Sequence, residues 1–122
     1  MAIYLDGTIN GVKIYRALLT QSGTNDPTVT VLENTIGTIV WTRYDEGEFR
    51  GTLSGAFPQE KTFLITGSEF DVPFGNTDAV LHYFKRLNDD VVYLWILDAG
   101  PQNPIDGENT DNPLSVEIRV YP

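Results

Sequence analysis

The chain has 122 residues, of which 41% are hydrophobic and 20% charged, a composition typical of one globular domain that excludes a disordered or membrane-spanning protein. Its 17 acidic and 8 basic residues give a net charge of -9, so phosphate backbones and anionic membrane surfaces would repel it. The absence of cysteine excludes disulfides, thiolate metal sites and a cysteine nucleophile.

Neither a membrane span nor a targeting signal is visible in the sequence. No apolar run approaches the ~20 residues that a membrane-spanning helix needs. The first residues, MAIYLDGTING, lack the basic flank and the long apolar stretch of a signal peptide. We therefore expect no membrane and no nucleic acid as partner, and we expect the protein in the cytoplasm of the cell that makes it.

Short runs rich in β-branched and aromatic residues follow one another along the chain, separated by Gly, Asn, Asp and Pro. A turn signal at nearly every gap is typical of an antiparallel all-β domain. We expect a single domain over residues 1–122, folded as an antiparallel β-sandwich or a small barrel, with a jelly-roll-like arrangement among the forms considered. The expected strands cover residues 2–5, 12–21, 28–33, 36–44, 48–57, 61–67, 80–87, 91–98 and 114–121.

The stretch VWTRYDEGEFRGTLSGAF is typical of two strands around a tight turn. A three-residue loop that ends in a left-handed Gly47 would place Tyr44 opposite Glu48. In the same register, Trp41 lies opposite Gly51. A glycine at that position leaves room for the indole ring, which covers backbone that would otherwise be bare. We therefore predict that Trp41 anchors the core.

The stretch VLHYFKRLNDDVVYLWILD forms a second candidate hairpin. With residues 88–90 as the turn, Tyr83 lies opposite Trp95, and Tyr93 shares their face. Both faces of this hairpin are apolar, which is typical of a strand that is central in a sandwich or covered by another subunit. Residues 80–87 also fit the spacing of an amphipathic helix, so helix and strand both stay open, with the strand favoured because the apolar run after the turn needs a partner.

Signatures of catalysis and of cofactor binding are absent from the sequence. His82 is the only histidine, and no G-x-S-x-G nucleophile motif or phosphate-binding lysine loop accompanies it. Paired carboxylates fall in expected turns, where acidic side chains are commonly solvated. We therefore expect no enzymatic activity and no cofactor, and we expect His82 in a packed or rim position.

The loop IDGENTDNP offers oxygen ligands for calcium at Asp106, Glu108 and Asp111. It is not an EF-hand, because Asp111 stands where that loop requires glycine and Pro113 follows. A polar surface loop is the favoured interpretation, and a structural calcium site is the alternative.

The chain resembles a group of small all-β structural proteins of tailed phages that infect Bacteroidetes, and of related environmental viruses, in five segments: YRALLTQSG, VLENTIG, VWTR, GTLSGAF and VEIRVYP. The resemblance is strongest over residues 15–57 and 114–122, and the chain departs from it over residues 68–113. It implies a virion structural protein, such as a head decoration protein, a fibre or spike component, or a tail accessory subunit. No active-site motif travels with it.

We therefore expect a non-enzymatic structural subunit that forms homo-oligomers, binds other virion proteins and resides in the virion after assembly in the host cytoplasm. The expected contact residues are Tyr83, Tyr93 and Trp95. The alternative is a carbohydrate-binding module in which Tyr83, Tyr93 or Trp95 provides the ring that stacks on glycans of the host surface, beside acid-rich loops.

Overall fold

The computed structural model describes residues 11–67, 80–98, 103–106 and 113–122, and eight strands lie within them. The strands are β1 (Lys13–Thr20), β2 (Thr28–Asn34), β3 (Val40–Asp45), β4 (Glu48–Thr52), β5 (Thr62–Thr66), β6 (Val80–Asn88), β7 (Val91–Asp98) and β8 (Leu114–Val120). The first expected strand, at residues 2–5, lies outside the described residues. The other expected strands are confirmed, and residues 80–87 belong to a strand rather than a helix.

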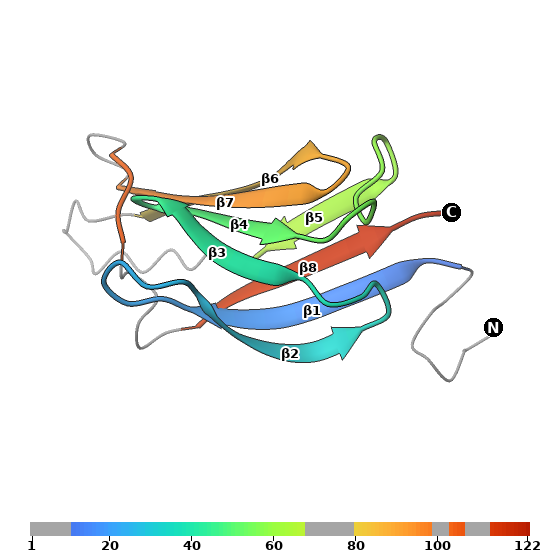
Figure 1. Cartoon of the computed structure of the whole chain (residues 1–122), viewed down its shortest axis with the longest axis horizontal. Helices are drawn as coiled ribbons and strands as arrows, with labels where there is room; N and C mark the ends of the chain where they lie inside the picture. Colours follow the sequence, from blue (N-terminus) through green and yellow to red (C-terminus); the bar gives the residue numbers. More distant parts are fainter. Residues whose placement is uncertain (1–10, 68–79, 99–102, 107–112) are drawn as a thin grey trace.

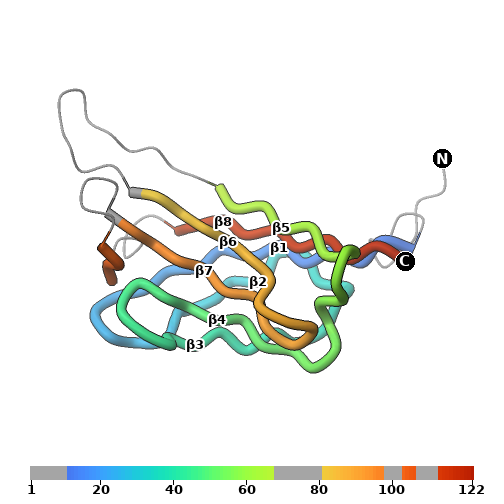
Figure 2. The backbone as a smooth tube through the Cα atoms, turned by 90° about the horizontal axis from the view of Figure 1, so that it is seen from above, coloured from blue at the N-terminus to red at the C-terminus, as the bar shows by residue number. Residues whose placement is uncertain are grey.

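The strands form two antiparallel sheets packed face to face (Figure 1). We call the sheet with the order β2-β1-β8-β5 sheet A, and the sheet with the order β3-β4-β7-β6 sheet B. Figure 2 shows β5 and β8 along one side of the molecule and β3 and β4 along the other. Over the part of the chain that the structure describes, there is no helix and the sheets do not close into a barrel, so the expected β-sandwich is confirmed.

Side chains from the inner faces of both sheets meet in one hydrophobic core. Along each strand successive side chains point to opposite faces, so one face of each sheet is buried and the other is exposed. The buried cluster comprises Tyr15, Ala17, Leu19, Ile39, Trp41, Phe49, Phe57, Phe84, Val92, Leu94, Ile96, Leu114, Val116, Ile118 and Val120.

The β3–β4 hairpin has the predicted register along most of its length, with Trp41 opposite Gly51. At the turn the prediction is wrong, because Asp45 rather than Tyr44 lies opposite Glu48. A register shift leaves Tyr44 in a bulge, so the loop has two residues instead of three. Of the two loop residues only Gly47 has a positive φ, 66°, so the predicted left-handed glycine is present although the register at the turn differs.

Gly51 makes room for the indole of Trp41, as the sequence predicts. A Cβ at Gly51 would lie 3.1 Å from Cη2 of Trp41 and 2.9 Å from Cγ2 of Ile39. The indole is 5% exposed, and its Nε1 donates a hydrogen bond of 3.1 Å to Oη of Tyr15 on the opposite sheet. Trp41 is therefore the core anchor that its sequence context predicts.

Two strands are shorter than expected because polar side chains build turns at their ends. The Gly37 N–H donates to Oδ1 of Asn34 at 3.0 Å, and the turn so formed delays the start of β3. The Gly55 N–H donates to Oδ1 of Asp90 at 2.7 Å, which directs the chain out of sheet B after β4. Asn and Asp side chains commonly replace ladder bonds in this way.

Candidate functional site

Four aromatic side chains gather on the outer face of sheet B, and we call this surface the aromatic face. It comprises Tyr44 from β3, Tyr83 from β6, and Tyr93 and Trp95 from β7. Their positions follow from the period of the strands, because neighbouring residues such as Leu94 point into the core. Tyr44 is 60% exposed, Tyr83 42% and Trp95 41%, while Tyr93 is half-buried.

Three of these rings lie beside one another. Tyr83 pairs with Trp95 across the β6–β7 ladder, as expected from the sequence. The ring centroids of Tyr93 and Trp95 are 5.8 Å apart, with an angle of 55° between the ring planes. Tilted contacts of this kind are favourable between aromatic side chains. The sheet therefore holds the rings in a fixed arrangement on its surface.

Two charged side chains of β4 complete the aromatic face. In the β4–β7 ladder Glu48 lies opposite Trp95 and Arg50 opposite Tyr93. The Arg50 Nε donates to Oε2 of Glu48 at 2.8 Å. Its guanidinium carbon lies 3.3 Å from the centroid of the Tyr44 ring, a cation–π contact. The face thus combines rings with hydrogen-bonding groups of both charges.

The structure brings together all three aromatic residues that the sequence singles out, Tyr83, Tyr93 and Trp95. Sequence reasoning missed Tyr44 and Arg50 as members of the same surface. The hairpin pattern of the sequence does place both on the outer side of β3 and β4. The missing information was the pairing of β4 with β7, which no local pattern encodes.

His82, the only histidine, lies on β6 opposite Ile96 and is half-buried. Both of its ring nitrogens are shielded from solvent. His82 is therefore packed, which is one of the two positions that the sequence predicts, packed or at the rim.

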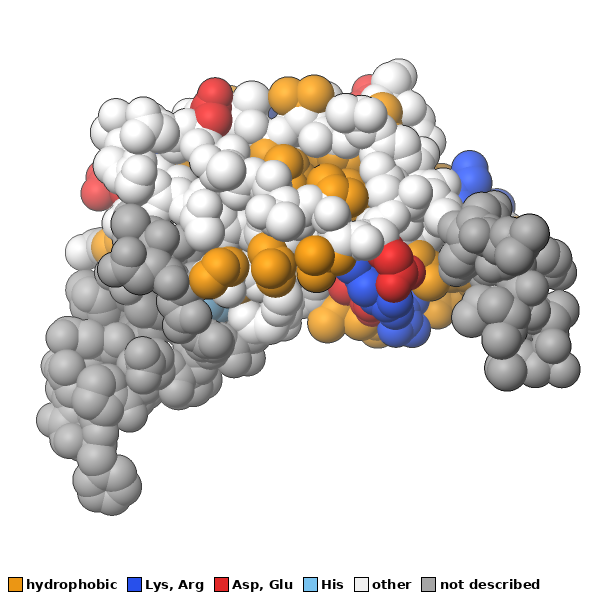
Figure 3. Space-filling view, turned by 90° about the horizontal axis from the view of Figure 1, so that it is seen from below, with side chains coloured by type: hydrophobic (Ala, Val, Ile, Leu, Met, Phe, Trp, Pro, Cys, Tyr) orange, Lys and Arg blue, Asp and Glu red, His pale blue; other side chains and the backbone are white. Residues whose placement is uncertain are grey.

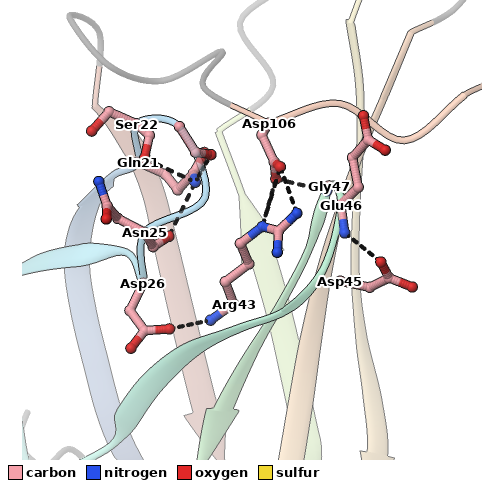
Figure 4. Close-up of polar contacts among 10 residues, drawn as sticks. Gln21, Ser22, Asn25, Asp26, Arg43, Asp45, Glu46, Gly47 and Asp106 are labelled. Atoms are coloured by element: carbon pink, nitrogen blue, oxygen red, sulfur yellow. Dashed lines mark hydrogen bonds and ion pairs between the residues drawn. The ribbon is translucent and has the colours of Figure 1, made fainter.

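The candidate calcium ligand Asp106 is engaged within the protein (Figure 4). Its Oδ2 accepts a hydrogen bond of 2.8 Å from Nη2 of Arg43, and its Oδ1 accepts one of 2.9 Å from the N–H of Gly47. These contacts fasten the short segment 103–106 to the turn of the β3–β4 hairpin. The other two candidate ligands, Glu108 and Asp111, lie outside the described residues. Among the residues that are described, no group of three or more His, Asp or Glu could hold a metal ion.

The electrostatics of Asp106 follow from these contacts. Burial opposes its ionisation, but the hydrogen bonds and charge of Arg43, together with the Gly47 amide, lower the pKa of the carboxyl below its ordinary value. A carboxyl whose pKa is lower in the folded state stabilises the fold above its unfolded-state pKa of about 3.9. That contribution is lost as the pH falls through the folded-state pKa.

We expect Asp106→Asn to lower the melting temperature at pH 7, because the ion pair with Arg43 is lost. The difference from the wild type should shrink as the pH falls below about 4, where the unfolded wild-type carboxyl is protonated, and should vanish once the pH has fallen through the lower folded-state pKa. Thermal unfolding followed by circular dichroism between pH 7 and pH 2 measures both effects. Glu60→Gln, at an exposed position outside the strands, is the control and should change neither value. A difference that stays constant over the whole pH range would contradict the assignment.

Comparison of the chain with protein-family models, with curated proteins and with solved structures found no match. The described residues contain no helix long and apolar enough to cross a membrane. The features available for a functional assignment are therefore the residues and surfaces of the chain itself.

Proposed function

We propose that this chain is a non-enzymatic structural subunit of a phage virion that acts by protein–protein assembly. The observation that carries the proposal is the aromatic face, on which Tyr44, Tyr83 and Trp95 are exposed. Tyr83 lies next to Trp95, and Tyr44 lies next to Arg50. Aromatic side chains and arginine are enriched at protein interfaces and dominate their binding energy. Monomeric proteins rarely expose large contiguous apolar patches, and a patch of this kind is typical of an interaction site.

The virion enters the proposal through the resemblance of the five sequence segments to phage structural proteins. A head decoration protein, a fibre or spike component, and a tail accessory subunit all act by such surface contacts. The net charge of -9 suits a position on the outside of a DNA-filled shell, because it disfavours binding to the packaged DNA. The lack of cysteine suits assembly in a reducing host cytoplasm.

Quantitative mass spectrometry of purified particles of the encoding virus tests the proposal directly. We expect the number of copies of this chain per particle to be a simple fraction of the number of copies of the major shell protein. The value of the ratio separates a decoration protein, which is abundant, from a fibre or tail subunit. Absence of the chain from clean particles would refute the structural role.

Trp95→Ser is expected to reduce incorporation of the chain into particles, because the substitution removes the largest ring of the aromatic face. Loss of a central interface tryptophan typically weakens binding by about 2 kcal/mol or more, which is about 30-fold. The number of copies per particle, counted by mass spectrometry of virus carrying the substitution, measures the effect. Phe63→Ser is the control, since Phe63 is 53% exposed but lies on the outer face of sheet A. Equal incorporation of both variants would exclude the aromatic face as the contact surface.

A carbohydrate-binding module is the second candidate, and one observation favours it. Trp95 and Tyr83 are exposed side by side, with the carboxylate of Glu48 and the guanidinium of Arg50 next to them. Sugars are bound by rings that stack on them and by charged groups that accept and donate hydrogen bonds to hydroxyls.

A glycan array separates the two candidates. If the chain is a carbohydrate-binding module, it binds host-surface glycans and this binding changes its tryptophan fluorescence. The Trp95→Ala variant should then no longer bind these glycans. Trp41 is only 5% exposed, so an external ligand would act on the fluorescence of Trp95. Absence of any glycan-dependent change would reject this candidate and leave the structural role unaffected.

A further inference from the structure

The edge of sheet A at β2 (Thr28–Asn34) is apolar, and no other described strand covers it. Among the strands that the structure describes, β2 pairs with β1 alone, so half of its backbone N–H and C=O groups face none of them. Its side chains are also exposed: Val31 is 47% and Leu32 60% accessible. Figure 3, which looks onto this side of the molecule, shows a row of hydrophobic side chains beside a cluster of charged ones.

Apolar surface continues from this edge onto the outer face of sheet A. Leu32 lines a shallow groove of about 300 Å³ together with Leu18 of β1 and Ile65 of β5. The groove also borders Arg16, which pairs with Glu33 at 2.9 Å and with Glu117. The charges that flank the edge are therefore neutralised within the chain.

The other described sheet edges carry features that protect an edge from pairing. At β3 the N–H of Arg43 donates to Oδ1 of Asp26 at 2.8 Å, so a loop occupies part of that edge (Figure 4). β5 lies against β6 of the opposite sheet, and β6 carries Lys85 and Arg86. Blocking loops, covered edges and basic side chains are the usual means by which proteins prevent edge pairing. Within β2 there is neither a lysine nor a proline.

We propose that β2 pairs antiparallel with β2 of a second copy, about a two-fold axis through Thr30. The two copies of sheet A then form one continuous sheet of eight strands. In this register Val29 lies opposite the partner's Val31, and Thr30 lies opposite the partner's Thr30. Cross-strand pairs of β-branched residues are favourable in antiparallel sheets, and a two-fold axis makes the contact self-complementary.

The edge meets the condition that charge sets for a second copy of this chain. A chain of net charge -9 repels its own copies unless the contact is free of unpaired acids. The paired stretch, residues 28–32, contains no charged residue. Glu33 lies just beyond it and is held by Arg16. The shift in the β1–β2 register comes after Val31, so residues 28–31 of the paired stretch are regular and only Leu32 lies at the bulge.

Cysteine cross-linking tests this register, because the chain has no cysteine and one introduced thiol is therefore unique. A two-fold axis through Thr30 brings the two Cβ atoms of a Thr30→Cys dimer within about 5 Å, close to disulfide distance. We expect Thr30→Cys to form a covalent dimer on mild oxidation. Ser54→Cys, in the exposed turn after β4, is the control, and its dimer yield should be at least about tenfold lower. Equal yields for both variants would overturn the proposal.

Sedimentation velocity supplies the second measurement, on a matched pair of lysine variants. Val31→Lys places a charge in the pairing edge and should weaken the dimer at least about tenfold. Phe63→Lys makes the same change at the opposite edge strand of the same sheet and should leave the dimer intact. A wild-type chain that stays monomeric at about 1 mM, or a dimer that Val31→Lys leaves unchanged, would overturn the proposal. The aromatic face lies on sheet B, so neither result depends on the role proposed for it.

Discussion

Trp41→Ala is expected to lower the free energy of unfolding by about 3–5 kcal/mol. The indole fills space between the two sheets, with its ring centroid 6.2 Å from that of Phe84 and its atoms against Gly51. Truncation leaves a cavity there and removes the hydrogen bond to Tyr15, whose side chain is 1% exposed. For a domain with a total stability of about 5–15 kcal/mol, the loss is a large fraction.

Denaturant unfolding followed by far-ultraviolet circular dichroism measures this loss. Trp95→Ala is the matched control, because the same truncation at a 41% exposed position creates no cavity. Its effect should stay below about 1 kcal/mol. An effect of Trp41→Ala no larger than that of Trp95→Ala would show that the indole does not hold the sheets together.

Tyr15→Phe separates the hydrogen bond from the packing. Burial raises the pKa of the Tyr15 hydroxyl, although the bond from Trp41 acts in the opposite direction, so the group is neutral at pH 7 and accepts the indole N–H. Removal of the hydroxyl leaves that buried N–H without its acceptor, at a cost of about 1–3 kcal/mol. The remainder of the Trp41→Ala effect is then the contribution of packing.

Gly47→Ala is expected to have the second large effect, a loss of about 2–5 kcal/mol in the free energy of unfolding. Gly47 has a φ of 66°, in the left-handed region that side chains disfavour. A Cβ there would also lie 2.5 Å from the backbone N of Ile105 and 2.7 Å from the backbone O of Ile96. These atoms belong to a hydrogen-bonded junction, since the Ile105 N–H donates to the Ile96 carbonyl at 3.0 Å. Backbone held in this way cannot move aside at low cost.

Gly55→Ala separates the steric clash from the backbone strain. Gly55 has nearly the same φ, 67°, but a Cβ there meets nothing within 4 Å. Its substitution should cost only the conformational strain, about 1–2 kcal/mol. The difference between the two variants, measured by denaturant unfolding, is the cost of displacing the segment that carries Asp106. Equal losses would mean that this segment moves freely.

Three of the four aromatic residues of the aromatic face were predictable because hairpins are local. The turn between β6 and β7 is one residue shorter than the predicted 88–90, because Asn88 lies opposite Val91 and the register shifts at Leu87. The register beyond that shift is the predicted one, so Tyr83, Tyr93 and Trp95 fall on one side. Tyr44 and Arg50 follow the same rule within their own hairpin. The pairing of the two hairpins through β4 and β7 was not predictable, because no short turn connects these two strands and sets their register.

The all-β class, the strands that the structure describes, the registers of the two hairpins away from their turns, and the role of Trp41 all follow from the sequence alone. Each of these depends on alternation along a strand or on a nearby turn, which act over a few residues. The neighbour of each hairpin and the pairing of β1 with β8 follow from the packing of the whole fold. The ion pair between Arg16 and Glu117 joins residues 101 positions apart. Pairings at that distance are chosen by how completely the two sheets bury one core, and burial is a property of the whole chain.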